Sequence, residues 1–132
     1  MTFVALPPTS GTTPAQPASQ TVFNDGFFPD INLADVRDAA RIPTSITDRR
    51  LREAVRGAIL TAASDLAGLV ATAAAAGHQT LADVPAPELD GDSVQLVRYR
   101  RAIALLAKAE LIERHRDFDT TGAGGAQADD LT

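Results

Sequence analysis

Only a few side chains in this sequence are of the types that bind metals or perform catalysis. His78 and His115 lie far apart in the chain, and there is no cysteine. A protein zinc site needs a cluster of nitrogen, sulfur or carboxylate ligands, and a serine nucleophile needs a base beside it. The sequence therefore predicts no catalytic centre, no metal site and no cofactor. We interpret His78 as a solvated loop residue and His115 as a cation near the end of a helix.

The glycine-rich and acidic stretches carry no recognised chemical motif either. The run GAGG at 122–125 lacks the lysine of a phosphate-binding loop, and no strand precedes it. Two acidic pairs, Asp90 with Asp92 and Asp129 with Asp130, are typical of a turn and a tail rather than of an acid–base couple. Together these observations predict that the protein is not an enzyme.

The arginines are the more informative charged residues. Arg49, Arg52 and Arg56 have the spacing i, i+3, i+7 of one helical face, and a second cluster is formed by Arg98, Arg100 and Arg101. One interpretation is that they form solvated faces and pairs with the chain's own aspartates. A second is that they dock onto acidic patches of neighbouring subunits, because a guanidinium group matches a carboxylate geometrically. A third is that they bind phosphate groups, which the negative net charge of the chain disfavours.

Composition favours one small helical domain that does not bind DNA tightly. The 132 residues are 45% hydrophobic but only 5% aromatic, and the net charge is −5. Such a chain lacks the aromatic supply of a β-sandwich, and its charge repels nucleic acid. No segment is long and apolar enough to cross a bilayer, and the first eight residues do not resemble a secretory signal. We expect a soluble protein made in a cytoplasm.

The first thirty residues divide into two parts. Residues 1–22 contain four prolines and no charged side chain, which predicts either a disordered tail or an extended arm that lies on a partner subunit. Residues 23–30 hold Phe23, Phe27 and Phe28, three of the five phenylalanines. This aromatic segment is interpreted as a lid over the core, as a contact between subunits, or as both.

The remaining chain predicts three helices and a flexible end. A short helix is expected at 33–41, capped by Asn32 and with Leu33, Val36 and Ala40 on one face. A long continuous helix is expected at 48–76, ending at Gly77, and a third helix at 92–116. Residues 77–91 form a connector, with a single helical turn after Thr80 and a turn at Asp90. The third helix is apolar on more than one side, which suggests an oligomer. The predicted units are an arm (1–22), a helical domain (23–118) and a flexible segment (119–132).

The order of the motifs along the chain resembles a known family. The resemblance rests on the stretches NDGFFPDINLADVR at 24–37, TDRRLREA at 47–54, LADVP at 81–85, DGDSV at 90–94, YRRA at 99–102, AELIERHRDFD at 109–119 and TG at 121–122. None is diagnostic alone, but their joint order and spacing resemble the head completion (head stabilisation) proteins of contractile-tailed temperate phages, the gene L product family. The resemblance covers about residues 23–131.

The resemblance implies an all-α fold of the head–tail connector type and a structural role in the virion. Members of such a family bind the portal protein after DNA packaging, form a ring of twelve copies at the neck, stabilise the filled head and provide the platform for a downstream neck or tail-terminator protein. DNA would pass through the channel without sequence-specific binding. Synthesis would take place in the cytoplasm of the bacterial host. Family members usually continue past Asp130 into a further helix, so this chain is either a short member or lacks a segment that docks on the portal.

The contacts with the portal or with other subunits are assigned from the residues and not from the family name. The candidates are Phe23, Phe27, Phe28, Pro29, Asp30, Arg49, Arg52, Arg56, Arg98 and Arg101. The alternative function is a small helical regulator or partner-binding protein with no virion role. A DNA-binding module is a third class, which would need a basic face that the composition does not supply.

Overall fold

The computed structural model describes residues 19–121, and within this range the fold is predominantly helical. The predicted arm at 1–18 and the C-terminal residues 122–132 lie outside the described residues. The elements in chain order are β1 (Thr21–Val22), β2 (Ile31–Asn32), α2 (Leu33–Ala40), α3 (Asp48–Asp65), α4 (Ala67–Ala75), the 3-10 turn η1 (Leu81–Asp83), β3 (Glu88–Leu89), β4 (Asp92–Ser93) and α5 (Val94–Thr121).

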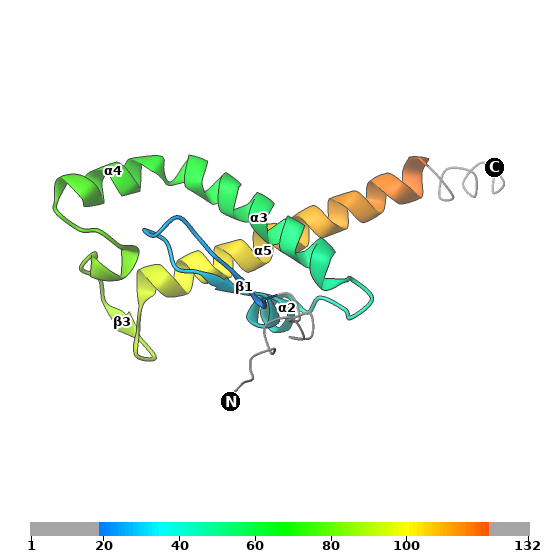
Figure 1. The fold of residues 1–132 in the computed structure, drawn as a ribbon, viewed down its shortest axis with the longest axis horizontal. Coiled ribbons are helices and arrows are strands. Elements are labelled where there is room, and N and C mark those ends of the chain that lie inside the picture. The colour runs from blue at the N-terminus through cyan, green and yellow to red at the C-terminus, as the bar shows by residue number, and fades with distance from the viewer. Residues whose placement is uncertain (1–18, 122–132) are drawn as a thin grey trace, which may run out of the picture.

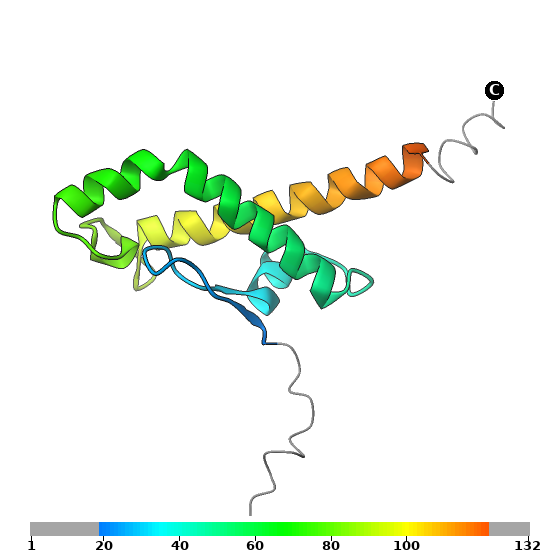
Figure 2. The ribbon, with the colours of Figure 1, turned by 45° about the horizontal axis from the view of Figure 1, so that its top comes forward.

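Helix α5 is the spine of the molecule. At 1.5 Å per residue its 28 residues span about 42 Å. Tyr99, Ile103 and Ala107 recur every four residues and are buried, so they form one inward face. Helix α3 crosses α5, and α2 also lies against α5 (Figures 1 and 2). The C-terminal part of α5 projects beyond the body. The helix begins two residues later than predicted because Asp92 and Ser93 form β4, and it continues beyond the predicted end.

Helix α2 forms where the sequence predicts a helix. The side chain of Asn32 accepts a hydrogen bond from the backbone N–H of Asp35, which caps the first turn. The helix ends at Arg41, which takes the left-handed conformation with φ of 55°. Leu33, Val36 and Ala40 are buried, which confirms the predicted inward face of this helix.

The long helix predicted at 48–76 is not continuous, and this prediction was wrong. Helices α3 and α4 are separated at Leu66 and bent by 60°. Helix α3 buries a regular face that includes Leu51, Val55 and Ala58. The bend allows Leu66, Leu69 and Val70 to pack on the same core, which a straight rod leaving a small domain would not achieve. The predicted cap is correct, since Gly77 follows α4 with φ of 86°.

Two short antiparallel pairs add strand structure that the all-α prediction did not contain. Thr21 pairs with Asn32 and Val22 with Ile31, so β1 and β2 close the aromatic segment into a loop. Residues 21 and 22 therefore belong to the folded body, although the sequence assigned them to the arm. Strands β3 and β4 form a hairpin whose turn is Asp90–Gly91, both with positive φ.

No single helix among residues 19–121 meets the length and hydropathy expected of a membrane span, although α3 and α4 taken together as a bent pair do.

Candidate interaction surfaces

The aromatic segment at 23–30 is held rigidly by its own polar side chains. The Asp25 carboxylate accepts hydrogen bonds from the backbone N–H groups of Phe27 at 3.0 Å and Phe28 at 3.1 Å. The Asp30 carboxylate accepts one from the N–H of Asn24 at 2.8 Å. The Asn24 side-chain amide donates to the Tyr99 hydroxyl of α5 at 2.8 Å and to the Pro29 carbonyl at 3.1 Å. The segment is therefore tied both to itself and to the spine helix.

The three phenylalanines of this segment have different environments. Phe28 is 3% exposed and stacks on Tyr99, with ring centroids 4.5 Å apart and planes 7° from parallel. Phe27 is half-buried and meets Phe28 edge to face at 5.0 Å. Phe23 is 74% exposed. Phe28 is thus part of the core, as the lid interpretation expects, and Phe23 is the ring left available to a partner.

Burial also changes the ionisation of Tyr99. The pKa of its hydroxyl is raised above the ordinary value of 10.0, mainly because burial disfavours the phenolate, while the hydrogen bond from Asn24 acts in the opposite direction. Tyr99 was not among the predicted site residues. The sequence signal was its position as the sole tyrosine, on the apolar face of the third predicted helix.

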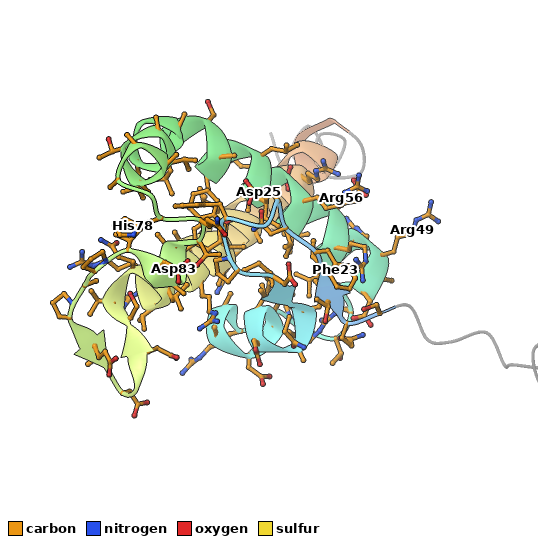
Figure 3. The ribbon with its side chains drawn as sticks, turned by 60° about the vertical axis from the view of Figure 1, so that its left-hand side comes forward. Phe23, Asp25, Arg49, Arg56, His78 and Asp83 are labelled. Carbon is orange, nitrogen blue, oxygen red and sulfur yellow. The ribbon has the colours of Figure 1, made fainter. Side chains whose placement is uncertain are left out.

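The arginines at the start of α3 face different surroundings, although their spacing places them on one side of the helix. Arg52 donates to the backbone carbonyl of Thr21 at 3.3 Å and to that of Ser19, so it holds β1 against α3. Arg56 pairs with Glu53 at 2.9 Å on the exposed side of the helix. Arg49 is exposed, points away from the body (Figure 3), and has no ion-pair partner among the side chains of residues 19–114.

Arg37 is the charged residue that sequence reasoning missed. Its guanidinium donates to the carbonyls of Pro43 and Ile46 and pairs with Asp48 at 2.8 Å. Hydrogen bonds from Gln20 and from Arg37 hold the pKa of the Asp48 carboxyl below its ordinary value of 3.8. These contacts fix the loop between α2 and α3, and so they set where α3 begins.

A groove between α2 and α5 brings two predicted residues together. Asp30 and Arg101 both line it, and its volume is about 560 Å³. Arg100, which also lines the groove, pairs with Asp92 at 3.7 Å. Arg98 is exposed and does not line the groove. The groove contains both charge signs and an apolar floor, which suits a peptide or protein segment better than a small ion.

Large apolar side chains remain exposed at several separate places, and sequence reasoning did not single them out as contact candidates. They are Leu60 on α3, Leu89 on β3, and Leu105 and Ile112 on α5. The exposure of Leu105 and Ile112 agrees with the prediction that the third helix is apolar on more than one side. No three potential metal ligands gather anywhere in residues 19–121.

Comparison with known proteins places this arrangement in a family. The family model described as phage head completion protein (GPL) matches residues 22–132. The chain is 34% identical over 128 residues to the head completion/stabilization protein of Escherichia phage P2, which covers 97% of this chain and 72% of that protein. No solved structure matches the chain. Because both likenesses extend over most of its length, the chain belongs to the phage head completion protein family.

Proposed function

We propose that this protein is a structural component of the virion neck. Copies of the chain bind the portal after DNA packaging, form a ring at that vertex, stabilise the filled head and provide the platform for the tail. The observation that carries the proposal is the 34% identity to the P2 head completion/stabilization protein along 97% of the chain. The family model matches the folded body from Val22, in β1, onward.

The exposed surface supports a role in assembly. Phe23, Leu60, Leu89, Leu105 and Ile112 leave apolar groups in water at separate places on a small body. A subunit that contacts two neighbours and a portal needs apolar groups exposed on more than one face. The net charge of −5 supports a channel through which DNA moves without being held.

The predicted contact residues have separate roles in this proposal. Phe23 and Arg49 are free to contact other subunits or the portal, and Arg56 is exposed although it pairs with Glu53. Phe28 and Arg52 position the segment that carries Phe23. The groove that contains Asp30 and Arg101 is a second contact site on the same body. Phe27, Pro29 and Arg98 are partly or fully exposed beside these sites and complete the set.

The direct test is to mix the purified protein with the portal of its own phage and image the mixture by cryo-EM. We expect a ring of this protein stacked on the portal, with the aromatic segment or the α3 arginines at a subunit boundary. A monomer or dimer that does not bind the portal, both for this chain and for a version extended at its C-terminus, would overturn the proposal in favour of a small regulatory protein.

A further inference from the structure

We propose that the tip of the β3–β4 hairpin of one copy docks on the outer face of α3 in the next copy. The hairpin tip is defined as Glu88, Leu89 and Asp90, and the α3 outer face as Arg49, Arg56 and Leu60 with Phe23 at its flank. The ring in which this contact repeats rests on the proposed function, but the pairing of two copies can be measured without the portal.

The hairpin tip is an exposed acidic surface with an apolar residue at its centre. Its three residues are all exposed, and Leu89 is 56% exposed. The turn at Asp90–Gly91 has positive φ at both residues, as in the tight turns that hold a two-residue hairpin in a fixed shape. Among the side chains of residues 19–114, neither Glu88 nor Asp90 has an ion-pair partner, whereas Asp92 is paired with Arg100.

The α3 outer face is the basic counterpart. Arg49, Arg56 and Leu60 follow the spacing i, i+7, i+11, so they lie in one row along the helix. This row is opposite to the face that buries Leu51 and Val55. Leu60 is 72% exposed, and Arg49 points into solvent (Figure 3). Glu53, four residues after Arg49, lies in the same row and pairs with Arg56. The face therefore has one net positive charge, centred on Arg49, beside the apolar Leu60, and this charge is opposite in sign to that of the hairpin tip.

Arg52 brings Phe23 to the flank of this face. Its guanidinium holds the carbonyls of Ser19 and Thr21, so β1 runs beside the first turns of α3. Val22 is buried and the following residue, Phe23, faces outward, as the alternation of a strand requires. Figure 3 shows Phe23, Arg49 and Arg56 on the same side of the molecule, away from His78 and Asp83.

The two surfaces lie at opposite ends of the body. In Figure 1 the hairpin is at the left, and the start of α3 is at the right, where the chain leaves the loop after α2. One copy therefore cannot join its own two surfaces. A contact between different surfaces of identical copies is heterologous, and repetition of such a contact produces a ring when the rotation closes. The partner of each surface is a second copy of this chain, because the chain itself carries both complementary surfaces.

Charge reversal tests the contact. One variant, Glu88→Lys with Asp90→Asn, makes the hairpin tip basic; asparagine is used because it tolerates positive φ. The other, Arg49→Glu with Arg56→Glu, makes the α3 outer face acidic. In either variant alone, the hairpin tip and the α3 outer face carry charge of the same sign and repel each other. We therefore expect the self-association constant of each variant to fall at least about tenfold at low salt. An equal mixture restores opposite charges at every contact and should recover wild-type association.

A matched control changes net charge elsewhere. Asp38→Lys with Asp65→Asn alters the charge by the same amount as the hairpin variant, at exposed residues outside both surfaces. We expect it to associate like the wild type. Circular dichroism confirms that every variant is folded before association is measured by sedimentation and by native mass spectrometry.

The outcomes separate the contact from the ring. Loss in each variant with recovery in the mixture supports the contact. Portal-bound rings or solution oligomers that form equally well with either variant overturn the contact and leave the ring intact. Variants that lose pairing and recover it when mixed, in a protein that never binds the portal, overturn the proposed function alone. A wild-type chain that associates neither with itself nor with the portal overturns both.

Cross-linking gives a second, independent readout, because the sequence contains no cysteine. Leu60→Cys and Leu89→Cys are made separately and treated with a short bis-maleimide. We expect each variant alone to stay monomeric, and the mixture to yield one dimer. A variant that cross-links to itself as fast as the mixture does would show a symmetric contact and would overturn the inference.

Discussion

Tyr99 connects the aromatic segment to the spine helix. Its ring stacks on Phe28, and its hydroxyl accepts a hydrogen bond from Asn24. It is the sole tyrosine in a chain without tryptophan. The near-ultraviolet absorbance of tyrosinate therefore reports the ionisation of this one buried group.

Alkaline unfolding tests the raised pKa of Tyr99. Above the ordinary pKa of 10.0 the unfolded chain releases the phenol proton while the folded chain retains it. The folded state then binds more protons, so the free energy of unfolding falls as pH rises beyond about 10. Urea denaturation at several pH values should show this fall in the wild type. Tyr99→Phe should lack it, because the variant has no phenol group to ionise at this position.

Gly57 and Glu110 meet where α3 crosses α5. A methyl group added at Gly57 would lie 3.0 Å from each carboxylate oxygen of Glu110. One of these oxygens, Oε2, is buried without a hydrogen-bond partner, while Arg114 approaches the other at 3.4 Å. The carboxylate therefore occupies the space that glycine leaves open.

A double-mutant cycle measures this contact. Alanine in place of a helical glycine stabilises by about 1 kcal/mol when nothing obstructs the methyl group. We expect Gly57→Ala to deliver that gain in the Glu110→Ala background and a smaller gain, or a loss, in the wild type, where the carboxylate must move. Chemical denaturation of the four proteins gives the coupling energy. Equal effects of Gly57→Ala in both backgrounds would contradict the close approach.

At the scale of elements, the bend between α3 and α4 determines how the chain covers its core. Two glycines flank α4 and have opposite requirements. Gly68 lies in its first turn with open space around it, whereas Gly77 follows its end with φ of 86°. The backbone at Gly68 does not require glycine, whereas the backbone at Gly77 has a conformation that residues with a side chain disfavour.

Matched alanine substitutions distinguish the two positions. Gly68→Ala should raise the free energy of unfolding by up to about 1 kcal/mol through helix propensity. Gly77→Ala should lower it by about 1 kcal/mol, because alanine is strained in the left-handed region. Thermal unfolding of both variants gives the comparison. A loss of stability in Gly68→Ala would indicate that the bend depends on that glycine.

Sequence patterns predicted those elements whose signals are local. The Asn32 cap, the stop at Gly77 and the turn at Asp90 each depend on neighbours along the chain, and each is found in the structure. The bend at Leu66 was not predicted because apolar residues continue through it without a proline or a change of period. Its cause is tertiary, namely the core that both helices cover.

The strands and the roles of the arginines escaped prediction for related reasons. Two-residue strands are too short to show alternation, so β1 and β3 left no pattern to detect. Spacing placed Arg49, Arg52 and Arg56 on one face, but it could not indicate that Arg52 borders β1 while Arg49 faces solvent. Phe23 and Phe28 are likewise both phenylalanines in one short loop, and they differ only because Phe28 packs against Tyr99.

At the scale of the whole molecule, the positions of the exposed charges matter more for assembly than the net charge does. Glu88 and Asp90 on the β3–β4 hairpin have no ion-pair partner among the described side chains, and arginines line the start of α3 at the other end. Exposed charges of this kind influence association more than folding, because salt bridges in water contribute little to stability.

Salt should therefore separate assembly from folding. Raising the ionic strength from low values to about 0.5 M reduces the range of exposed charges to a few ångströms. We expect self-association, measured by sedimentation, to weaken steeply over this range, while the thermal unfolding midpoint changes little. Association that strengthens with salt would indicate that apolar contacts such as Leu89 and Leu60 dominate instead of charge.

The placement of the two complementary surfaces at opposite ends also has a consequence for timing. Subunits that each carry two different, complementary surfaces can assemble into an open filament as readily as into a closed ring. Weak individual contacts avoid this, because dilute copies then remain separate. A template that seats several copies side by side raises their effective concentration to the millimolar range, and neighbours then join without any stronger bond. A scaffold, rather than affinity alone, would thus decide when and where the copies polymerise.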